Sequence, residues 1–160
     1  MSQPWPDPPL QVVLVEPEIP PNTGNIARTC AATGTRLHLV HPLGFEISDK
    51  QVKRAGLDYW PHVDLHEHAS LEECLHATGG GQRAWYLSKK ADRSLYDVEF
   101  QPGDTLVFGP ETRGLPEPLL EKAGANALRI PMRGDAVRSL NLGNAVAVTL
   151  YEALRQTGGF

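Results

Sequence analysis

The sequence predicts an α/β fold in which helices cover both faces of a mainly parallel sheet. Three observations support this class. The first forty residues read as a strand, a helix and a second strand, and such a unit joins parallel strands. Short apolar runs alternate with helical patterns along the rest of the chain. The 160 residues, 41% hydrophobic and 21% charged, match one globular domain with its own core.

The first unit begins with a β-branched run at Gln11–Val15, which predicts a buried strand. A Pro-rich turn follows, and Asn22 or Thr23 is expected to cap a helix that runs to about Thr33. Gly34 is expected to end that helix, because glycine adopts the left-handed conformation of a C-cap without strain.

The later elements are assigned from apolar runs, helical spacing and the turn residues between them. They are strands at Leu37–Val40, Ala84–Ser88, Thr105–Phe108 and Leu128–Ile130, and helices at Ser70–Ala77 and Pro118–Ala123. The glycines at 79–81 predict a plain connector, because no strand leads into them and no Walker-type lysine follows.

The final helix, from about Leu140 to Gln156, carries an apolar stripe at helical spacing. The stripe consists of Leu142, Ala145, Val146, Thr149, Leu150, Ala153 and Leu154. Ala147, Val148 and Tyr151 add apolar surface beyond it. A helix that is apolar on more than one side is buried on more than one side. We therefore expect either a homodimer, with a second subunit on the extra surface, or a wider groove within one chain.

Composition narrows the class of protein. No apolar run approaches the roughly 20 residues that span a bilayer, so no membrane partner is expected. Residues 1–9 contain four prolines and no basic region followed by an apolar one, which predicts a stiff, disordered leader and not a signal peptide. We expect a cytoplasmic protein with residues 10–160 as its single domain.

The formal net charge of −4 is unusual for a protein that binds nucleic acid by itself, because phosphate neutralisation supplies most of the affinity. Local basic clusters nevertheless occur. They are Lys50, Lys53 and Arg54; Lys89, Lys90 and Arg93; and Arg129, Arg133 and Arg138. Each cluster taken alone is typical of a solvated face.

The cysteines and histidines follow no familiar metal-ligand spacing. Cys30 and Cys74 are far apart, and Cys30 falls on the apolar face of the first helix, so both are expected to be reduced and structural. His62, His66 and His68 are close in sequence, but no carboxylate or cysteine pattern accompanies them. We interpret them as exposed histidines at a helix edge and expect no metal site.

Polar side chains follow the carboxyl ends of the predicted strands, which is the edge where open α/β sheets bind ligands. They are Glu16 and Asn22, then Ser88 and Lys89, Glu111 and Arg113, and Ser139 and Asn141. Asn25 and Arg28 share one face of the first helix and can point into the same crevice. Each residue alone has an ordinary structural role as a cap or an ion-pair partner, but their convergence predicts one ligand site.

Glycines in this region predict close backbone approach or positive φ at Gly109 and Gly114. The glycine-rich dinucleotide fingerprint is absent after the first strand, and so is a Walker P-loop. These absences argue against a nicotinamide enzyme and against a P-loop nucleotide hydrolase.

Three segments, in order along the chain, resemble the motifs of the SPOUT methyltransferases. They are Pro20–Arg28, Phe108–Pro116, and Ile130–Met132 together with Ser139–Val146. The match is closest to the small tRNA 2′-O-methyltransferases of the TrmL type, and Glu16–Asn22 and Arg54–Tyr59 also resemble that group. The likeness spans about residues 11 to 158 and excludes the Pro-rich leader.

The resemblance implies an α/β fold with a C-terminal trefoil knot that works as a homodimer. It implies S-adenosyl-L-methionine as the cofactor, held in the knot largely by backbone groups. The implied contacts are Leu87, Gly109, Ile130 and Ser139. The implied reaction moves the methyl group to the ribose 2′-hydroxyl of the wobble nucleotide, a cytidine or a modified uridine, in the tRNA anticodon stem-loop.

The resemblance also implies residue roles. Arg28 is the residue assigned to the ribose hydroxyl, and we expect it to orient the ribose or stabilise the alkoxide, because a guanidinium stays protonated. The residues implied to shape the catalytic network are Asn22, Glu111, Ser139 and Asn141. Arg113 and Arg138, with Arg28, are implied to bind the substrate through its phosphates. No metal is implied, because the leaving sulfur becomes neutral.

Three other functions are compatible with these features. The first is methylation of another tRNA position or of ribosomal RNA, against which the segments around Glu16 and Arg54 argue. The second is a catalytically inactive RNA-binding module, and the intact motif residues argue against it. The third is an unrelated α/β protein that binds NAD or ATP.

Overall fold

The computed structural model describes residues 4–48, 50, 54, 59–79, 81–134 and 136–160. Within them the strands form one seven-stranded sheet in the order β3-β2-β1-β6-β4-β7-β5, and every paired neighbour is parallel. The strands are β1 (Gln11–Val15), β2 (Arg36–Val40), β3 (Leu65–His68), β4 (Ala84–Leu87), β5 (Arg93–Ser94), β6 (Thr105–Phe108) and β7 (Ala127–Arg129). The prediction of an α/β fold with a parallel sheet is confirmed.

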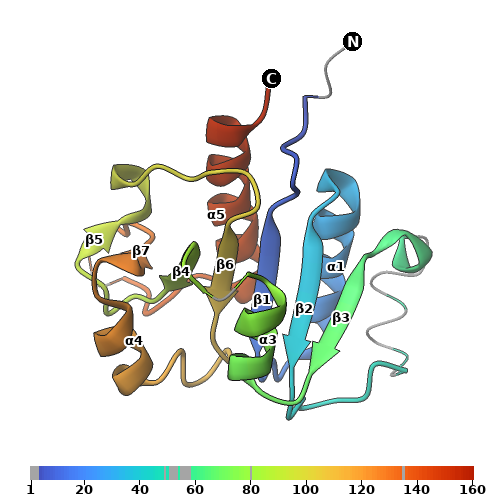
Figure 1. Ribbon diagram of the computed structural model, residues 1–160. Coiled ribbons are helices and arrows are strands. Elements are labelled where there is room, and N and C mark those ends of the chain that lie inside the picture. Colours follow the sequence, from blue (N-terminus) through green and yellow to red (C-terminus); the bar gives the residue numbers. More distant parts are fainter. Residues whose placement is uncertain (1–3, 49, 51–53, 55–58, 80, 135) are drawn as a thin grey trace.

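Helices cover both faces of this sheet (Figure 1). The helices are α1 (Pro20–Thr33), α3 (Leu71–Ala77), α4 (Glu117–Ala123) and α5 (Leu142–Thr157), with short 3₁₀ turns η1 (Trp60–His62), η2 (Leu95–Asp97) and η3 (Gly124–Asn126). Helices α1 and α5 pack on one face, where Val12 and Leu14 of β1 point. Helices α3 and α4 pack on the other, where Val13 and Val15 point. A central strand buried on both faces explains why its sequence is apolar from Val12 to Val15.

The register of the central strands sets where the site forms. Strand β1 pairs with β6 from Gln11 opposite Thr105 to Leu14 opposite Phe108, and β6 pairs in the same sense with β4. The carboxyl ends of β1, β4 and β6 therefore lie along one edge of the sheet. The segments that follow these strands carry the polar residues noted in the sequence.

Most predicted elements are confirmed, with shifts at helix starts. Helix α1 begins at Pro20, before the predicted cap, because proline has the fixed φ that suits a first helical turn. Asn22 thus lies inside the helix and is buried. Helix α5 begins at Leu142, and its N-cap is Asn141, whose side-chain oxygen accepts a hydrogen bond from the amide of Asn144. Gly34 ends α1 with a positive φ, as predicted.

The interpretation of the histidines as helix-edge residues is wrong for His66 and His68. His66 and His68 lie on β3, an edge strand that pairs with β2, and His62 lies in η1. The strand was missed because its sequence, Leu-His-Glu-His, lacks the β-branched run that identified the others. On β2, His38 is buried, and this burial, followed by the charges of His66 and His68, lowers the pKa of His38 to about 4. The short strand β5 was also missed.

The described part of the leader, residues 4–9, makes contact with the C-terminal residues of the chain. The indole of Trp5 meets the ring of Phe160 edge to face at a centroid distance of 4.8 Å. The carbonyl oxygen of Pro4 accepts a hydrogen bond of 2.6 Å from the amide of Gly159. Pro4 and Trp5 therefore lie beside the C-terminal residues, near the end of the chain marked C in Figure 1, and composition alone could not reveal this pairing.

Other expectations have simpler outcomes. Cys30 lies on α1 with its side chain buried in the core, which confirms its packing role. Burial raises the pKa of its thiol to about 12. Gly80 and Lys53 lie outside the described residues, so the connector and the first basic cluster are described only in part. Within the described residues, no helix is long and apolar enough to cross a membrane.

Candidate functional site

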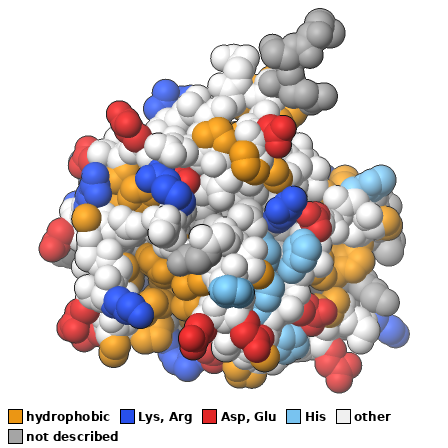
Figure 2. Space-filling view, in the orientation of Figure 1, with side chains coloured by type: hydrophobic (Ala, Val, Ile, Leu, Met, Phe, Trp, Pro, Cys, Tyr) orange, Lys and Arg blue, Asp and Glu red, His pale blue; other side chains and the backbone are white. Residues whose placement is uncertain are grey.

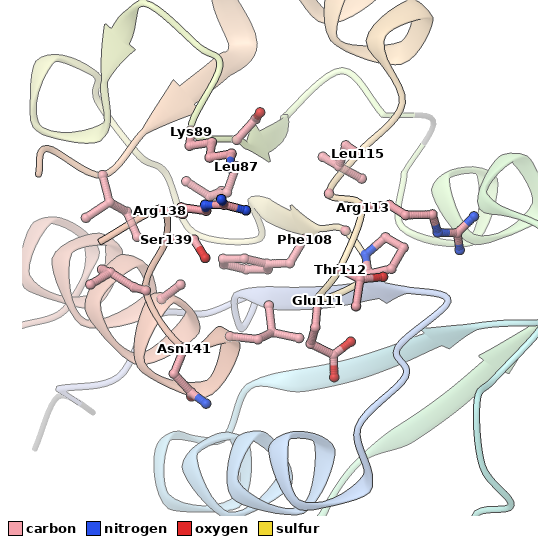
Figure 3. A pocket seen from close by; sticks show the side chains of 18 of the residues that line it. Leu87, Lys89, Phe108, Glu111, Thr112, Arg113, Leu115, Arg138, Ser139 and Asn141 are labelled. Carbon is pink, nitrogen blue, oxygen red and sulfur yellow. The ribbon is translucent and has the colours of Figure 1, made fainter. Parts of the chain in front are cut away.

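A cavity of about 620 Å³ opens at the carboxyl-terminal edge of the sheet, and this volume is typical of a small-molecule or cofactor site. Its apolar wall includes Leu87 and Phe108, the last residues of β4 and β6, and Ile130, which follows β7. Figure 3 shows Phe108 at the centre of this view, with Arg138 and Ser139 on one side and Glu111 on another.

The cavity brings together most of the residues singled out in the sequence. Its lining includes Leu87, Gly109, Ile130 and Ser139, and also Asn22, Glu111, Arg113, Arg138 and Asn141. Arg28 differs from them. It is exposed on α1, and its guanidinium carbon stacks 4.7 Å from the centroid of the Tyr59 ring, outside the lining of the cavity in the described chain.

Several lining residues were not singled out in the sequence, among them Ile19, Thr112 and Met132. Thr112 and Met132 lie within the motif segments, and Ile19 immediately precedes the first of them. The strand-tip pattern therefore identified the segments correctly. It could not identify which side chains within each segment face the cavity.

Gly109 allows the loop after β6 to fold back on itself. A Cβ atom at this position would lie 2.5 Å from the carbonyl carbon of Gly114 and closer still to the amide nitrogen of Leu115. Leu115 is buried among the residues packed on the α4 side of the sheet, so the returning loop is anchored. Gly114 has a φ of +68°, which glycine adopts without strain. The expected close approach at Gly109 is thus an approach of backbone to backbone.

Glu111 joins the loop after β6 to the start of α1. Its two carboxylate oxygens accept hydrogen bonds from the amides of Glu18 at 2.8 Å and Ile19 at 2.7 Å. Its Oε2 atom also accepts a bond of 3.3 Å from the side-chain amide of Asn22. A carboxylate at a helix N-terminus binds amides that the helix leaves unpaired and is favoured by the helix dipole.

Glu18 makes the reciprocal connection. Its Oε1 atom accepts hydrogen bonds from the amide of Thr112 at 3.0 Å and from the Thr112 hydroxyl at 2.7 Å. These two bonds, with a smaller contribution from the charge of Arg113, hold the pKa of the Glu18 carboxyl below its usual value. The loop and the helix are therefore tied by bonds in both directions.

Asn22 and Asn141 extend this network to α5. The side-chain amide of Asn141 donates a hydrogen bond of 3.0 Å to Oδ1 of Asn22, while its own oxygen caps α5. The carboxylate of Glu111 and the two asparagines thus connect three segments that are distant in sequence. This connection holds the start of both long helices at the rim of the cavity.

Replacing Glu111 by glutamine tests this network. Glutamine has one acceptor oxygen where the carboxylate has two, so one amide at the start of α1 loses its partner, and we expect a loss of about 1–3 kcal/mol in the free energy of unfolding. Glu117→Gln is the matched control, because Glu117 makes only a surface ion pair with Lys90, with its side chain 69% exposed. Denaturant unfolding measures the stability of both variants. Equal free energies of unfolding would contradict the role of Glu111.

The cationic residues around the cavity have different orientations. Lys89, Lys90 and Arg138 belong to its lining. The Arg113 side chain extends away from Ser139 in Figure 3, and its guanidinium lies 3.5 Å from the carboxylate of Glu16. The cavity mouth therefore combines an apolar floor, a polar network and a set of basic side chains.

The chain is similar over most of its length to known RNA methyltransferases. The sequence pattern of the SpoU rRNA Methylase family matches residues 9–151. The tRNA (cytidine(34)-2'-O)-methyltransferase of Methylovorus glucosotrophus is 53% identical over 146 residues, which cover 91% of this chain and 94% of the relative. The tRNA (cytidine(34)-2'-O)-methyltransferase of Escherichia coli is 50% identical over 150 residues, which cover 93% and 94%.

Solved structures agree with the sequence comparison. One, described as "Structural insights into the 2-OH methylation of C/U34 on tRNA", superimposes with a TM-score of 0.87 at 54% identity and covers 92% of this chain and 95% of that chain. An AdoMet-bound rRNA methyltransferase from Sinorhizobium meliloti shares the fold, with a TM-score of 0.80 at 24% identity over 96% of this chain and 58% of the other. The resemblance drawn from the three motifs is thereby confirmed, and the chain belongs to the SpoU rRNA methylase family.

Proposed function

We propose that this protein transfers a methyl group from S-adenosyl-L-methionine to the ribose 2′-hydroxyl of the wobble nucleotide in the anticodon loop of tRNA. The observation that carries the proposal is the identity of at least half of the aligned residues, over more than nine-tenths of both chains, with tRNA (cytidine(34)-2'-O)-methyltransferases. The accepted nucleotide is cytidine or a modified uridine, in keeping with the C/U34 specificity described for the similar structure.

The residues of the cavity fit S-adenosylmethionine. Leu87 and Ile130 offer apolar surfaces for a flat base, Ser139 offers a hydroxyl, and Gly109 exposes backbone without a side chain. When bound, this cofactor supplies a methyl group on a positively charged sulfonium, and the sulfur becomes neutral after transfer. The protein must therefore align the hydroxyl with the methyl group and assist the loss of the hydroxyl proton, without a metal at the reacting atoms.

The catalytic role of Arg28 in this proposal is electrostatic. A guanidinium stays protonated, so it orients the ribose or stabilises the developing alkoxide and does not accept the proton. Asn22, Glu111, Ser139 and Asn141 hold the surrounding network in position, as their hydrogen bonds and their place in the cavity suggest. Arg138 and Arg113, with the neighbouring lysines, bind phosphates of the RNA.

A homodimer completes the site in this proposal. Val148 and Tyr151 are exposed on α5, with 38% and 52% of their surface accessible, and they form the apolar surface beyond the core-facing stripe. Helices α1 and α5 are in contact, and Arg28 is exposed on α1 outside the cavity of its own chain. A second copy on this face would bury the tyrosine and bring the local basic clusters of two chains to one RNA-binding surface.

Replacing Tyr151 by aspartate is expected to dissociate the dimer. A charge buried without a partner costs about 3 kcal/mol or more, which weakens association by roughly 100-fold. Tyr96→Asp is the matched control, because Tyr96 is equally exposed, at 55%, but lies on η2. Light scattering at one protein concentration should give a dimer for the parent and the control and a monomer for Tyr151→Asp. A parent protein with the mass of one chain would contradict the proposal.

The remaining parts of the proposal concern topology and location. We propose that the segments after β6 and β7, which line one cavity together, form a C-terminal trefoil knot. Residues 10–160 make up the methyltransferase domain, preceded by the leader at 1–9. A tRNA substrate implies that the protein acts in the cytoplasm.

The test is methyl transfer from labelled S-adenosylmethionine to bulk unmodified tRNA, with the digested product mapped by mass spectrometry. A 2′-O-methyl group at the wobble nucleotide is the expected result. A label at another tRNA position, or on ribosomal RNA fragments only, would overturn the substrate and keep the chemistry. Cofactor binding without transfer to any RNA, including tRNA carrying its natural base modifications, would indicate an inactive binding module.

A further inference from the structure

A cluster of side chains that can bind a metal lies away from the cavity. It is on the face of the sheet that α3 and α4 cover, opposite the face covered by α1 and α5. It is formed by His38 of β2, His68 of β3 and Cys74 of α3. One imidazole nitrogen from each histidine and the sulfur of Cys74 lie within 4.8 Å of one another. We propose that these three side chains bind one divalent transition-metal ion, and that the ion is Zn²⁺.

The fold brings these residues together from three separate elements. In the β2–β3 ladder, His38 is opposite His66 and Val40 is opposite His68, so His38 and His68 are diagonal neighbours on the same face of the sheet. The Nδ1 atom of His38 and the Nε2 atom of His68 are 2.9 Å apart. Cys74, which is fully buried, points down from α3 onto this face. Figure 2 shows histidine side chains gathered on this face of the molecule.

A buried hydrogen bond prepares His38 to act as a ligand. Its Nε2 atom lies 2.8 Å from Oε1 of Gln11, whose side-chain nitrogen donates a hydrogen bond of 3.5 Å to the carbonyl oxygen of Gly103. The Gln11 oxygen is an acceptor, so Nε2 of His38 carries the proton and Nδ1 presents a lone pair to His68. A metal-bound histidine typically donates its other N–H to such an acceptor, which fixes its tautomer and orientation.

The donor types fit zinc, while the 2.9 Å between the two imidazole nitrogens is itself a hydrogen-bond length. Imidazole nitrogens and cysteine thiolates are ligands that zinc takes in proteins, and in a tetrahedral site with Zn–N of about 2.0–2.1 Å the two nitrogens are about 3.3 Å apart. The observed 2.9 Å reaches this value with a small side-chain rotation. His66 is not part of the cluster, which joins only His38, His68 and Cys74.

The fourth coordination position has a route to solvent. A surface hollow lined by His41, Glu67 and His68, among others, opens beside the cluster. It provides an entry path for the ion and room for a water ligand.

The proposed ion also has a structural rationale. Strand β3 is a short edge strand of which no residue is fully buried, so hydrophobic burial holds it only weakly. A metal bound by His38, His68 and Cys74 would join β2, β3 and α3 at one point. Binding displaces the thiol proton of Cys74, so metal uptake releases one proton and stabilises the folded chain.

The experiment uses the full-length protein after removal of metal with a chelator, and titrates it with Zn²⁺ against a chromophoric competitor. We expect one Zn²⁺ per chain, a higher Tm on binding, and a thiolate charge-transfer band when Co²⁺ replaces Zn²⁺. His68→Gln should weaken Zn²⁺ binding at least about 100-fold, the upper end of the loss caused by changing a supporting residue. Cys74→Ser should remove the charge-transfer band.

Two control variants make the experiment specific. His66→Gln changes a neighbouring histidine on the same strand, and Cys30→Ser changes the other buried thiol; both should bind Zn²⁺ as the parent does. If Cys74→Ser fails to fold, the affinities of His68→Gln and His66→Gln for Zn²⁺ still test the proposal. The proposal is wrong if the parent binds no stoichiometric Zn²⁺, or if His66→Gln and His68→Gln weaken binding equally. None of these measurements depends on methyl transfer.

Discussion

The Arg28→Ala variant is expected to transfer methyl groups to tRNA about 100- to 1000-fold more slowly than the parent, and to bind S-adenosylmethionine unchanged. This decrease in rate is the size expected when one hydrogen-bond donor to a developing oxyanion is removed. Cofactor binding is spared because Arg28 lies outside the cavity, with its guanidinium stacked on Tyr59. Single-turnover kinetics with tRNA and calorimetric titration with the cofactor would measure the two effects separately.

Two further variants define what Arg28 does. Arg28→Lys keeps the charge but lacks the planar fork of donors, so we expect it to recover only part of the lost rate. Arg36→Ala is the matched control, because Arg36 is another exposed arginine and makes only a surface bridge to Asp64. A loss of cofactor affinity in Arg28→Ala, or an equal loss of rate in Arg36→Ala, would contradict a specific role in catalysis.

The parts of the fold that were readable from the sequence are those fixed by local patterns. The run Gln11–Val15 is a strand because it is β-branched and buried on both faces, and Thr105–Phe108 behaves in the same way. The strand-tip residues Glu111, Ser139 and Asn141 share one cavity because parallel strands end at a common edge. A class of site could therefore be predicted before any contact was known.

The contacts within the site depend on tertiary structure and could not be predicted. Glu111 bonds to the amides of Glu18 and Ile19, which are 93 and 92 residues away in the chain. Glu111 was implied to shape the catalytic network, and its bonds join the loop after β6 to the start of α1. In the same way, Arg28 occurs in a cavity-lining motif but turns toward Tyr59.

The histidine cluster illustrates the same limit. His66 and His68 form part of a polar tetrapeptide that carries no strand signal, so the edge strand was not foreseen. Cys74 meets His38 and His68 only because α3 packs across β2 and β3. Spacing along the chain therefore argued against a metal site, whereas proximity in the fold favours one.

Gly109→Ala is expected to abolish tight binding of S-adenosylmethionine. The added Cβ would meet the backbone of Gly114 and Leu115, and a backbone cannot rotate away as a side chain does. The loop after β6 must therefore move away from β6, at a cost of about 1–3 kcal/mol or more for overpacking. Because this loop lines the cavity, we expect the cofactor Kd to rise at least about tenfold, which corresponds to 1.4 kcal/mol.

Gly159→Ala is the control that separates this steric effect from a general cost of replacing glycine. A Cβ at Gly159 would lie 3.6 Å from the Cα of Pro4, an ordinary contact, and far in sequence from the cavity loops. Its Tm and cofactor Kd should match those of the parent. If Gly109→Ala bound the cofactor as tightly as Gly159→Ala, the returning loop would be free to shift, and the close approach at Gly109 would not shape the site. A lower Tm in Gly109→Ala with unchanged affinity would assign that glycine to stability alone.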